Sequence, residues 1–88
     1  MAEIRVYGAT WCHMTTEAMD HLNELGVDYE FIDIEQDPDA ARWVAAQNGG
    51  KEKKPTLDIN GLVLSEPSAA ELDAALRDSG VPTGGRRA

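Results

Sequence analysis

Hydrophobic and polar residues alternate near the start of the chain and then recur at helical spacing. Residues 3–7 read Glu-Ile-Arg-Val-Tyr, which places Ile4 and Val6 on one face and predicts a short strand ending at Gly8. Apolar positions three and four residues apart then predict a helix over residues 13–25. Its expected apolar side consists of Met14, Ala18, Leu22 and Leu25.

The middle of the chain carries a second strand pattern and a second helix pattern. Residues 27–34 alternate with apolar side chains on both faces, so we expect a strand that is covered on both sides. Asp37 as N-cap and Pro38 at the first helical position predict a helix that ends at Asn48-Gly49-Gly50. Its apolar side is expected to consist of Ala41, Val44 and Ala45, with Trp43 nearby.

The last third of the chain predicts a hairpin and a third helix. Two short strands, 56–59 and 62–64, are joined by Asn60-Gly61, a two-residue turn typical of hairpins. Ser68 and Glu71 have the spacing of a capping box at the start of a helix. The buried side of this helix is expected to consist of Ala69, Leu72, Ala75 and Leu76.

The order of these elements, β-α-β-α-β-β-α, indicates the fold class. A strand–helix–strand start requires parallel pairing through a crossover, and the later hairpin adds an antiparallel pair. We therefore expect an α/β protein with a four-stranded mixed sheet and helices on both faces. Residues 1–82 would form this single domain, and residues 83–88 a flexible C-terminal tail.

Composition and charge narrow the function. The 88 residues include 16 acidic and 8 basic side chains, a net charge of −8 that argues against nucleic acid as a partner. No apolar run reaches the roughly 20 residues needed to cross a membrane, and no signal peptide is expected. The one cysteine, Cys12, cannot form an internal disulfide. We therefore expect a cytoplasmic protein, and a monomer.

Five short motifs occur in a specific order, from Ile4 to about Ser79. They are Val-Tyr-Gly-Ala-Thr-Trp-Cys at 6–12, Asp-Ile-Glu at 33–35, Asn-Gly-Gly at 48–50, Lys-Pro-Thr at 54–56 and Pro-Ser-Ala-Ala-Glu-Leu at 67–72. This set resembles the glutaredoxin branch of the thioredoxin superfamily, and is most similar to the mycoredoxins and small glutaredoxin-like proteins of bacteria. The resemblance implies a thioredoxin fold, thiol–disulfide oxidoreductase activity and a reactive Cys12.

The chain departs from the family pattern in three respects. Where the family usually has Cys-x-x-Cys, residues 12–15 read Cys-His-Met-Thr, so the second, resolving cysteine is missing. The Cys-Gly-Phe-Ser motif of monothiol glutaredoxins that carry iron–sulfur clusters is missing too. At residues 64–68, Leu-Ser-Glu-Pro-Ser replaces the Gly-Gly-x-Asp element with which glutaredoxins often hold glutathione. Glutathione is therefore in question as the thiol partner.

Cys12 and Thr15 are the candidate catalytic residues. At a helix start, unpaired N–H groups and the positive end of the helix dipole favour the thiolate, the form that attacks disulfides. The Thr15 hydroxyl is expected to donate a further hydrogen bond to the sulfur. These features predict a pKa of Cys12 below the free value of about 8.5. A buried, inert cysteine is the structural alternative.

The resemblance also implies which residues contact the small thiol. They are Trp11, His13, Met14, Lys54, Pro55, Thr56 and Ser65. Lys54-Pro55 stands where the family has a cis-proline facing the active cysteine. Lys54, with its neighbouring lysines, either attracts carboxylates of the thiol or belongs to a solvated loop. Trp11 either shields the sulfur and forms part of a recognition surface or only packs, and the His13 side chain is expected to point elsewhere.

With a single cysteine, the consistent chemistry is monothiol exchange. Cys12 would reduce mixed disulfides between proteins and a low-molecular-weight thiol, and glutathione, mycothiol and bacillithiol all fit. No bound metal is expected, because the soft candidate ligands are few. Two alternatives stay open: a thioredoxin-fold binding module without redox turnover, and an iron–sulfur cluster carrier in which two subunits each contribute Cys12.

Overall fold

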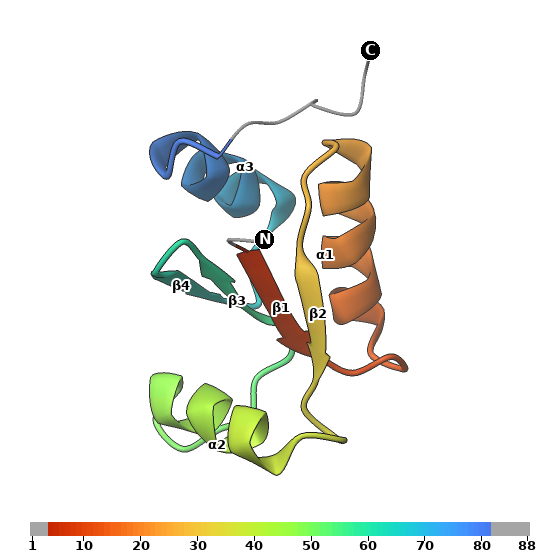
Figure 1. Cartoon of the computed structure of the whole chain (residues 1–88), viewed down its shortest axis with the longest axis vertical. Helices are drawn as coiled ribbons and strands as arrows, with labels where there is room; N and C mark the ends of the chain where they lie inside the picture. Colours follow the sequence, from red (N-terminus) through yellow and green to blue (C-terminus); the bar gives the residue numbers. More distant parts are fainter. Residues whose placement is uncertain (1–3, 82–88) are drawn as a thin grey trace.

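The computed structural model describes residues 4–81 and has the predicted order of elements (Figure 1). Its elements are β1 (Ile4–Gly8), α1 (His13–Glu24), β2 (Glu30–Asp33), α2 (Pro38–Gln47), β3 (Thr56–Ile59), β4 (Leu62–Ser65) and α3 (Ala69–Asp78). The four strands form one sheet in the order β2-β1-β3-β4. β1 and β2 are parallel and the other neighbouring pairs antiparallel, which confirms the mixed sheet. The predicted tail, residues 83–88, lies outside the described part.

Alternating side chains in β1 reach two hydrophobic cores, one on each face of the sheet. On one face, Ile4 and Val6 pack with buried residues of α1 and α3. On the other face, Tyr7 packs with Val44 of α2, and its ring stacks on Trp43 with centroids 4.6 Å apart. Helices therefore cover both faces of the sheet, as expected (Figure 1).

Local capping chemistry fixes several element boundaries as predicted. Asp37 caps α2 through its side chain. Ser68 Oγ accepts the N–H of Glu71 at 3.1 Å, and Glu71 Oε1 accepts the N–H of Ser68 at 2.8 Å, so the capping box of α3 is complete. The hairpin turn places Asn60 at φ 51° and Gly61 at φ 99°, the left-handed region that such turns require.

Three expectations about individual elements are wrong. β2 is shorter than the predicted strand 27–34, because the N–H of Val27 bonds to the Leu22 carbonyl at the end of α1. Met14, expected on the apolar side of α1, is 44% exposed. Ala69, expected on the buried side of α3, is exposed because it is the first residue of that helix.

Candidate active site

Cys12 lies between β1 and α1, at the N-terminus of the helix, where its backbone is extended (φ −82°, ψ 120°). Its N–H donates to the Ala9 carbonyl, and its own carbonyl accepts the N–H of Thr16, both at 3.1 Å. The Thr16 hydroxyl donates to the same carbonyl at 3.3 Å. These bonds fix the backbone of Cys12 beside the unpaired N–H groups of the first turn. A thiolate is therefore favoured at this position.

Thr15 is fully buried one turn away, against the end of β1. Its Oγ1 accepts the N–H of Ala9 at 3.5 Å, which leaves the hydroxyl hydrogen for the Cys12 sulfur. A Cβ on Gly8 would lie 2.4 Å from Thr15 Oγ1 and 2.6 Å from its Cγ2. Gly8 is thus required for this close approach, which sequence analysis missed because Gly8 was interpreted only as the end of a strand.

The pKa of the Cys12 thiol lies below the ordinary thiol value. Burial raises the pKa of Cys12, but hydrogen bonds and charge together lower it by more. The strongest lowering contribution to this pKa is the Thr15 hydroxyl, followed by the N–H groups of Thr15 and Met14 and by the charge of Lys54. The predicted direction is confirmed, and a larger fraction of Cys12 is thiolate at neutral pH than in a free cysteine.

The loop before β3 brings Lys54 and Pro55 to the sulfur. The Cys12 thiol donates to the carbonyl oxygen of Lys54, with Sγ and O 3.9 Å apart. The Lys54–Pro55 peptide bond is cis, as the family resemblance implied. Pro55 is buried, and its carbonyl accepts the N–H of Glu66 at 2.8 Å. The segments before β3 and after β4 are therefore tied together next to Cys12.

Trp11 is an exposed side chain beside Cys12. It is 66% exposed, and its Nε1–H donates to Glu35 Oε1 at 2.9 Å. The Nζ of Lys54 lies 5.5 Å from the centroid of the Trp11 ring. Of the two predicted roles for Trp11, this exposure favours a recognition surface over simple packing.

The other predicted contact residues lie in different surroundings. His13 points elsewhere, as expected: it is exposed, and its Nε2 lies 2.9 Å from Glu17 Oε2. Ser65 is exposed at the end of β4. Thr56 is fully buried, and its hydroxyl accepts from the Asn48 amide at 3.2 Å and donates within its own loop. The Thr56 side chain therefore supports the loop and is not open to a ligand.

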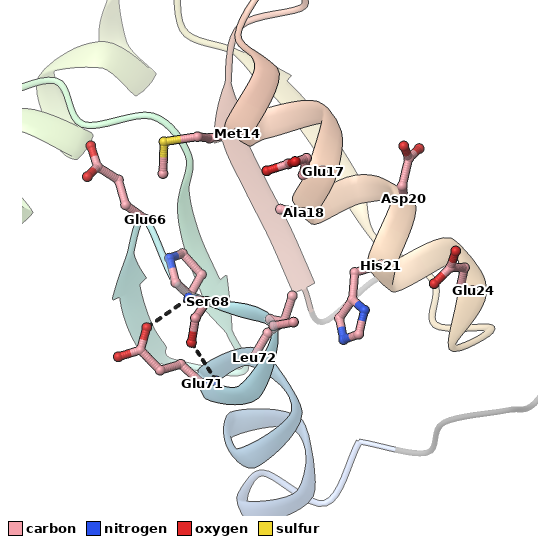
Figure 2. A pocket seen from close by; sticks show the side chains of 12 residues that line it. Met14, Glu17, Ala18, Asp20, His21, Glu24, Glu66, Ser68, Glu71 and Leu72 are labelled. Atoms are coloured by element: carbon pink, nitrogen blue, oxygen red, sulfur yellow. Dashed lines mark hydrogen bonds between the residues drawn. The ribbon is translucent and has the colours of Figure 1, made fainter.

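A groove of about 660 Å³ lies beside Met14, between α1 and the start of α3 (Figure 2). Figure 2 shows Met14 and Glu66 at one end of this groove and Glu24 at the other. Five acidic side chains line the groove: Glu17, Asp20, Glu24, Glu66 and Glu71. One basic side chain lines it, His21, which lies 2.7 Å from Asp73. We name this feature the acidic groove; sequence analysis did not predict it.

Comparison with known proteins assigns the family. Residues 4–64 match the family model described as Glutaredoxin. The chain belongs to the glutaredoxin family. It is 31% identical to Mycoredoxin 1 of Corynebacterium glutamicum over 77 residues, which cover 86% of this chain and 95% of that protein. It is 33% identical, over 76 residues, to a Mycobacterium tuberculosis protein described as a glutaredoxin, covering 85% of this chain and 90% of that protein.

Solved structures show the same fold for this glutaredoxin. The crystal structure of a glutaredoxin from Archaeoglobus fulgidus superposes with a TM-score of 0.76, covers 88% of each chain and is 23% identical. Family and fold together identify a thiol–disulfide oxidoreductase with a thioredoxin fold. Because Cys12 is the one cysteine of the sequence, it is the one candidate for the exchanging thiol.

Within residues 4–81, this glutaredoxin has neither a candidate metal site nor a helix that could span a membrane. No three side chains of His, Cys, Asp or Glu gather there in a way that could hold a metal ion. No helix in that part of the chain is long and apolar enough to cross a membrane, and α1, the longest, has 12 residues.

Proposed function

We propose that this glutaredoxin reduces mixed disulfides between cytosolic proteins and a small thiol, as a monomer and by a monothiol mechanism. The observation that carries the proposal is the placement of Cys12 at the start of α1, with its thiol pKa lowered. Thr15 stands where the family motif has its second cysteine, and it is fully buried. No second thiol of this chain is available to resolve the adduct on Cys12.

The cycle consists of two disulfide exchanges. In the first, the Cys12 thiolate attacks the small-thiol sulfur of the mixed disulfide and forms a new S–S bond. The protein sulfur leaves as a thiolate and takes a proton from water. In the second, another small thiolate attacks the small-thiol sulfur of the adduct, which releases the Cys12 thiolate and forms the disulfide of the small thiol. Over the cycle the protein sulfur of the mixed disulfide is reduced to a thiol, and two small-thiol units, one from the mixed disulfide and one added, leave as one disulfide.

A lowered thiol pKa assists both exchanges. In the first, it raises the fraction of Cys12 present as the attacking thiolate. In the second, Cys12 is the leaving group, and a thiol of lower pKa leaves faster. The hydrogen bonds from Thr15 and the helix N-terminus thus act on each half of the cycle. We propose that the small thiol lies against Trp11, Met14, Lys54 and Ser65, whereas Pro55 is fully buried like Thr56 and supports the loop.

The acidic groove favours a small thiol without carboxylates. Its five acids, against the single ammonium group of Lys54 near the sulfur, repel the carboxylates of glutathione and bacillithiol. Mycothiol joins N-acetylcysteine to a sugar and an inositol, so it offers hydroxyl donors to these acids and no negative group apart from its thiolate. We therefore propose mycothiol as the co-substrate, and the similarity to Mycoredoxin 1 supports this choice.

The test is adduct formation on the reduced protein. The protein is mixed separately with the disulfides of mycothiol, glutathione and bacillithiol, and its intact mass is measured, with protein alkylated at Cys12 as the blank. We expect each disulfide to leave one small-thiol adduct per chain. Each adduct is then treated with its own thiol, and we expect mycothiol to remove its adduct at least about threefold faster than glutathione or bacillithiol, the two anionic thiols, removes its own. Absence of any adduct would favour the binding module. Equal removal by all three thiols would refute the choice of mycothiol alone.

Charge reversal in the acidic groove is expected to change this preference. Replacing Glu17 and Glu66 by lysine should raise the ratio of the glutathione rate to the mycothiol rate about threefold, because two repulsive charges become attractive. The matched control is the double variant Asp28→Lys/Asp39→Lys, which changes the net charge by the same amount at two exposed residues outside the groove. The same ratio in both variants would mean that net charge, and not the groove, sets the preference.

A further inference from the structure

Three loops meet at the end of the sheet where Cys12 lies. β1 and β2 are parallel and β3 is antiparallel to β1, so the segments after β1 and β2 and before β3 share one end of the sheet (Figure 1). Each segment contributes one side chain to a contact there. Trp11 follows β1, Glu35 follows β2 and Lys54 precedes β3. These residues are separated in sequence and are brought together by the strand order.

Glu35 fixes the position of the Trp11 ring. With two thirds of its surface exposed, the indole has little packing to hold it, yet its Nε1–H donates to Glu35 Oε1 at 2.9 Å. The backbone of Glu35 is itself held, because its N–H donates to Asp33 Oδ1 at 2.9 Å. The backbone that carries the acceptor is thus held at the end of β2, and the hydrogen bond from Nε1 orients an otherwise exposed ring.

The Trp11 ring in turn holds the Lys54 side chain. Lys51 and Lys53 are exposed, whereas Lys54 is half-buried, with its Nζ 5.5 Å from the ring centroid. A cation at this distance from an indole ring is attracted by its electron-rich face. A lysine side chain otherwise samples many rotamers, so the contact restricts where its charge lies. The Lys54 carbonyl is 3.9 Å from Cys12 Sγ, so the backbone of Lys54 lies next to the sulfur, and the contact with Trp11, the residue before Cys12, holds the end of its side chain on the same side of the site.

We infer that Glu35 and Trp11 are positioning residues that hold the Lys54 ammonium group beside the Cys12 sulfur. The inference rests on the proposed function, in which that sulfur is the nucleophile of one exchange and the leaving group of the next. The role of Glu35 is to hold the indole ring through its hydrogen bond. Its charge does not help, because a negative charge disfavours a nearby thiolate. Trp11, Glu35 and Lys54 are far apart in the sequence, and only the folded chain brings them into contact.

The first experiment measures how fast iodoacetamide alkylates Cys12 between pH 4 and pH 10. This reagent is neutral, so the charge of Lys54 does not attract it. Trp11→Leu and Lys54→Met should each raise the pKa of Cys12 and slow alkylation about two- to threefold below that pKa, since higher nucleophilicity partly offsets the lost thiolate. The double variant should react no more slowly than Lys54→Met alone. Lys53→Met, which removes an exposed neighbouring charge, is the control.

The second experiment separates the hydrogen bond of Glu35 from its charge. Glu35→Gln and Glu35→Ala remove the same charge, but the glutamine can still accept from the indole Nε1–H. We expect alkylation to be about twofold slower in the alanine variant than in the glutamine variant. Equal rates in the two variants, or multiplying effects of Trp11→Leu and Lys54→Met, would overturn the inference.

Alkylation needs no disulfide substrate, so the inference and the proposed function can fail separately. Wild-type protein that forms the small-thiol adduct, with no coupling between Trp11 and Lys54 in alkylation, would refute the positioning role and leave monothiol exchange in place. Coupling in alkylation, with no adduct on the wild-type protein, would support the positioning role and refute the exchange. Circular dichroism of each variant tests whether the substitutions leave the fold intact.

Discussion

Replacing Gly8 by alanine is expected to lower the free energy of unfolding by about 2–3 kcal/mol, the cost of overpacking a filled site. The new methyl group would meet Thr15 at 2.4 Å from Oγ1 and 2.6 Å from Cγ2. Thr15 is β-branched and fully buried, so it cannot rotate away without loss of packing. Its displacement also removes the hydroxyl from the sulfur, so the pKa of Cys12 should rise. Urea unfolding and the pH profile of alkylation measure the two effects.

A double variant shows whether the contact with Thr15 is the cause. Thr15→Ala removes Oγ1 and Cγ2, the two nearest of the three atoms that the new methyl group would meet, and leaves only Cβ at 3.1 Å, so Gly8→Ala should cost much less stability in that background than in the wild type. The pKa of Cys12 should stay raised, because the hydroxyl is absent. The prediction fails if Gly8→Ala costs as much stability with alanine at position 15 as with threonine.

Local chemistry explains which parts of the fold could be predicted from the sequence. Asp37 and the Ser68–Glu71 pair bond to backbone groups within three residues, so their patterns alone locate the starts of α2 and α3. The strand 27–34 was predicted too long because alternation does not reveal backbone partners. The Val27 N–H is used at the end of α1, where Gly26 takes a φ of 71°.

In the candidate active site, too, features that depend on local spacing could be predicted, and features that depend on tertiary contact could not. The proximity of the Thr15 hydroxyl to the Cys12 sulfur could be predicted because helical spacing relates the two residues. Periodicity placed Met14 on the buried side of α1, but Thr15 takes the buried position because Gly8 leaves room for it, and this depends on tertiary contact. The contact of Trp11 with Lys54 also joins different loops, so no spacing along the chain encodes it.

The acidic groove illustrates why charge patterns are hard to interpret without a structure. Along α1 alone, Glu17, Asp20 and Glu24 form a polar side, which in isolation is typical of a solvated helix. Glu66, in the loop after β4, and Glu71, in the first turn of α3, lie across the groove from them, more than 40 residues later in the chain. Two ordinary exposed faces become one negative site through the packing of α3 beside α1.

The substitution Thr15→Val is expected to raise the pKa of Cys12 and slow exchange about three- to tenfold at pH values below that pKa. Valine keeps the shape of threonine but removes the hydroxyl, the strongest of the contributions that lower this pKa. It also leaves the buried N–H of Ala9 without its acceptor, which should cost about 1–3 kcal/mol of stability. The pH profile of alkylation, with urea unfolding, measures both changes.

The sign of the pH effect makes this prediction specific. Below the pKa, the variant holds less thiolate and reacts more slowly; above it, both proteins are fully thiolate, and the variant should react as fast as the wild type or slightly faster because its thiolate is more nucleophilic. Thr16→Val is the matched control, since the Thr16 hydroxyl bonds to the Cys12 carbonyl and not to its sulfur. Its profile should match the wild type, and Thr15→Ser, which keeps the hydroxyl, should remain close to it. An unchanged profile in Thr15→Val would instead mean that the N–H groups of the first turn of α1 hold the thiolate without the hydroxyl.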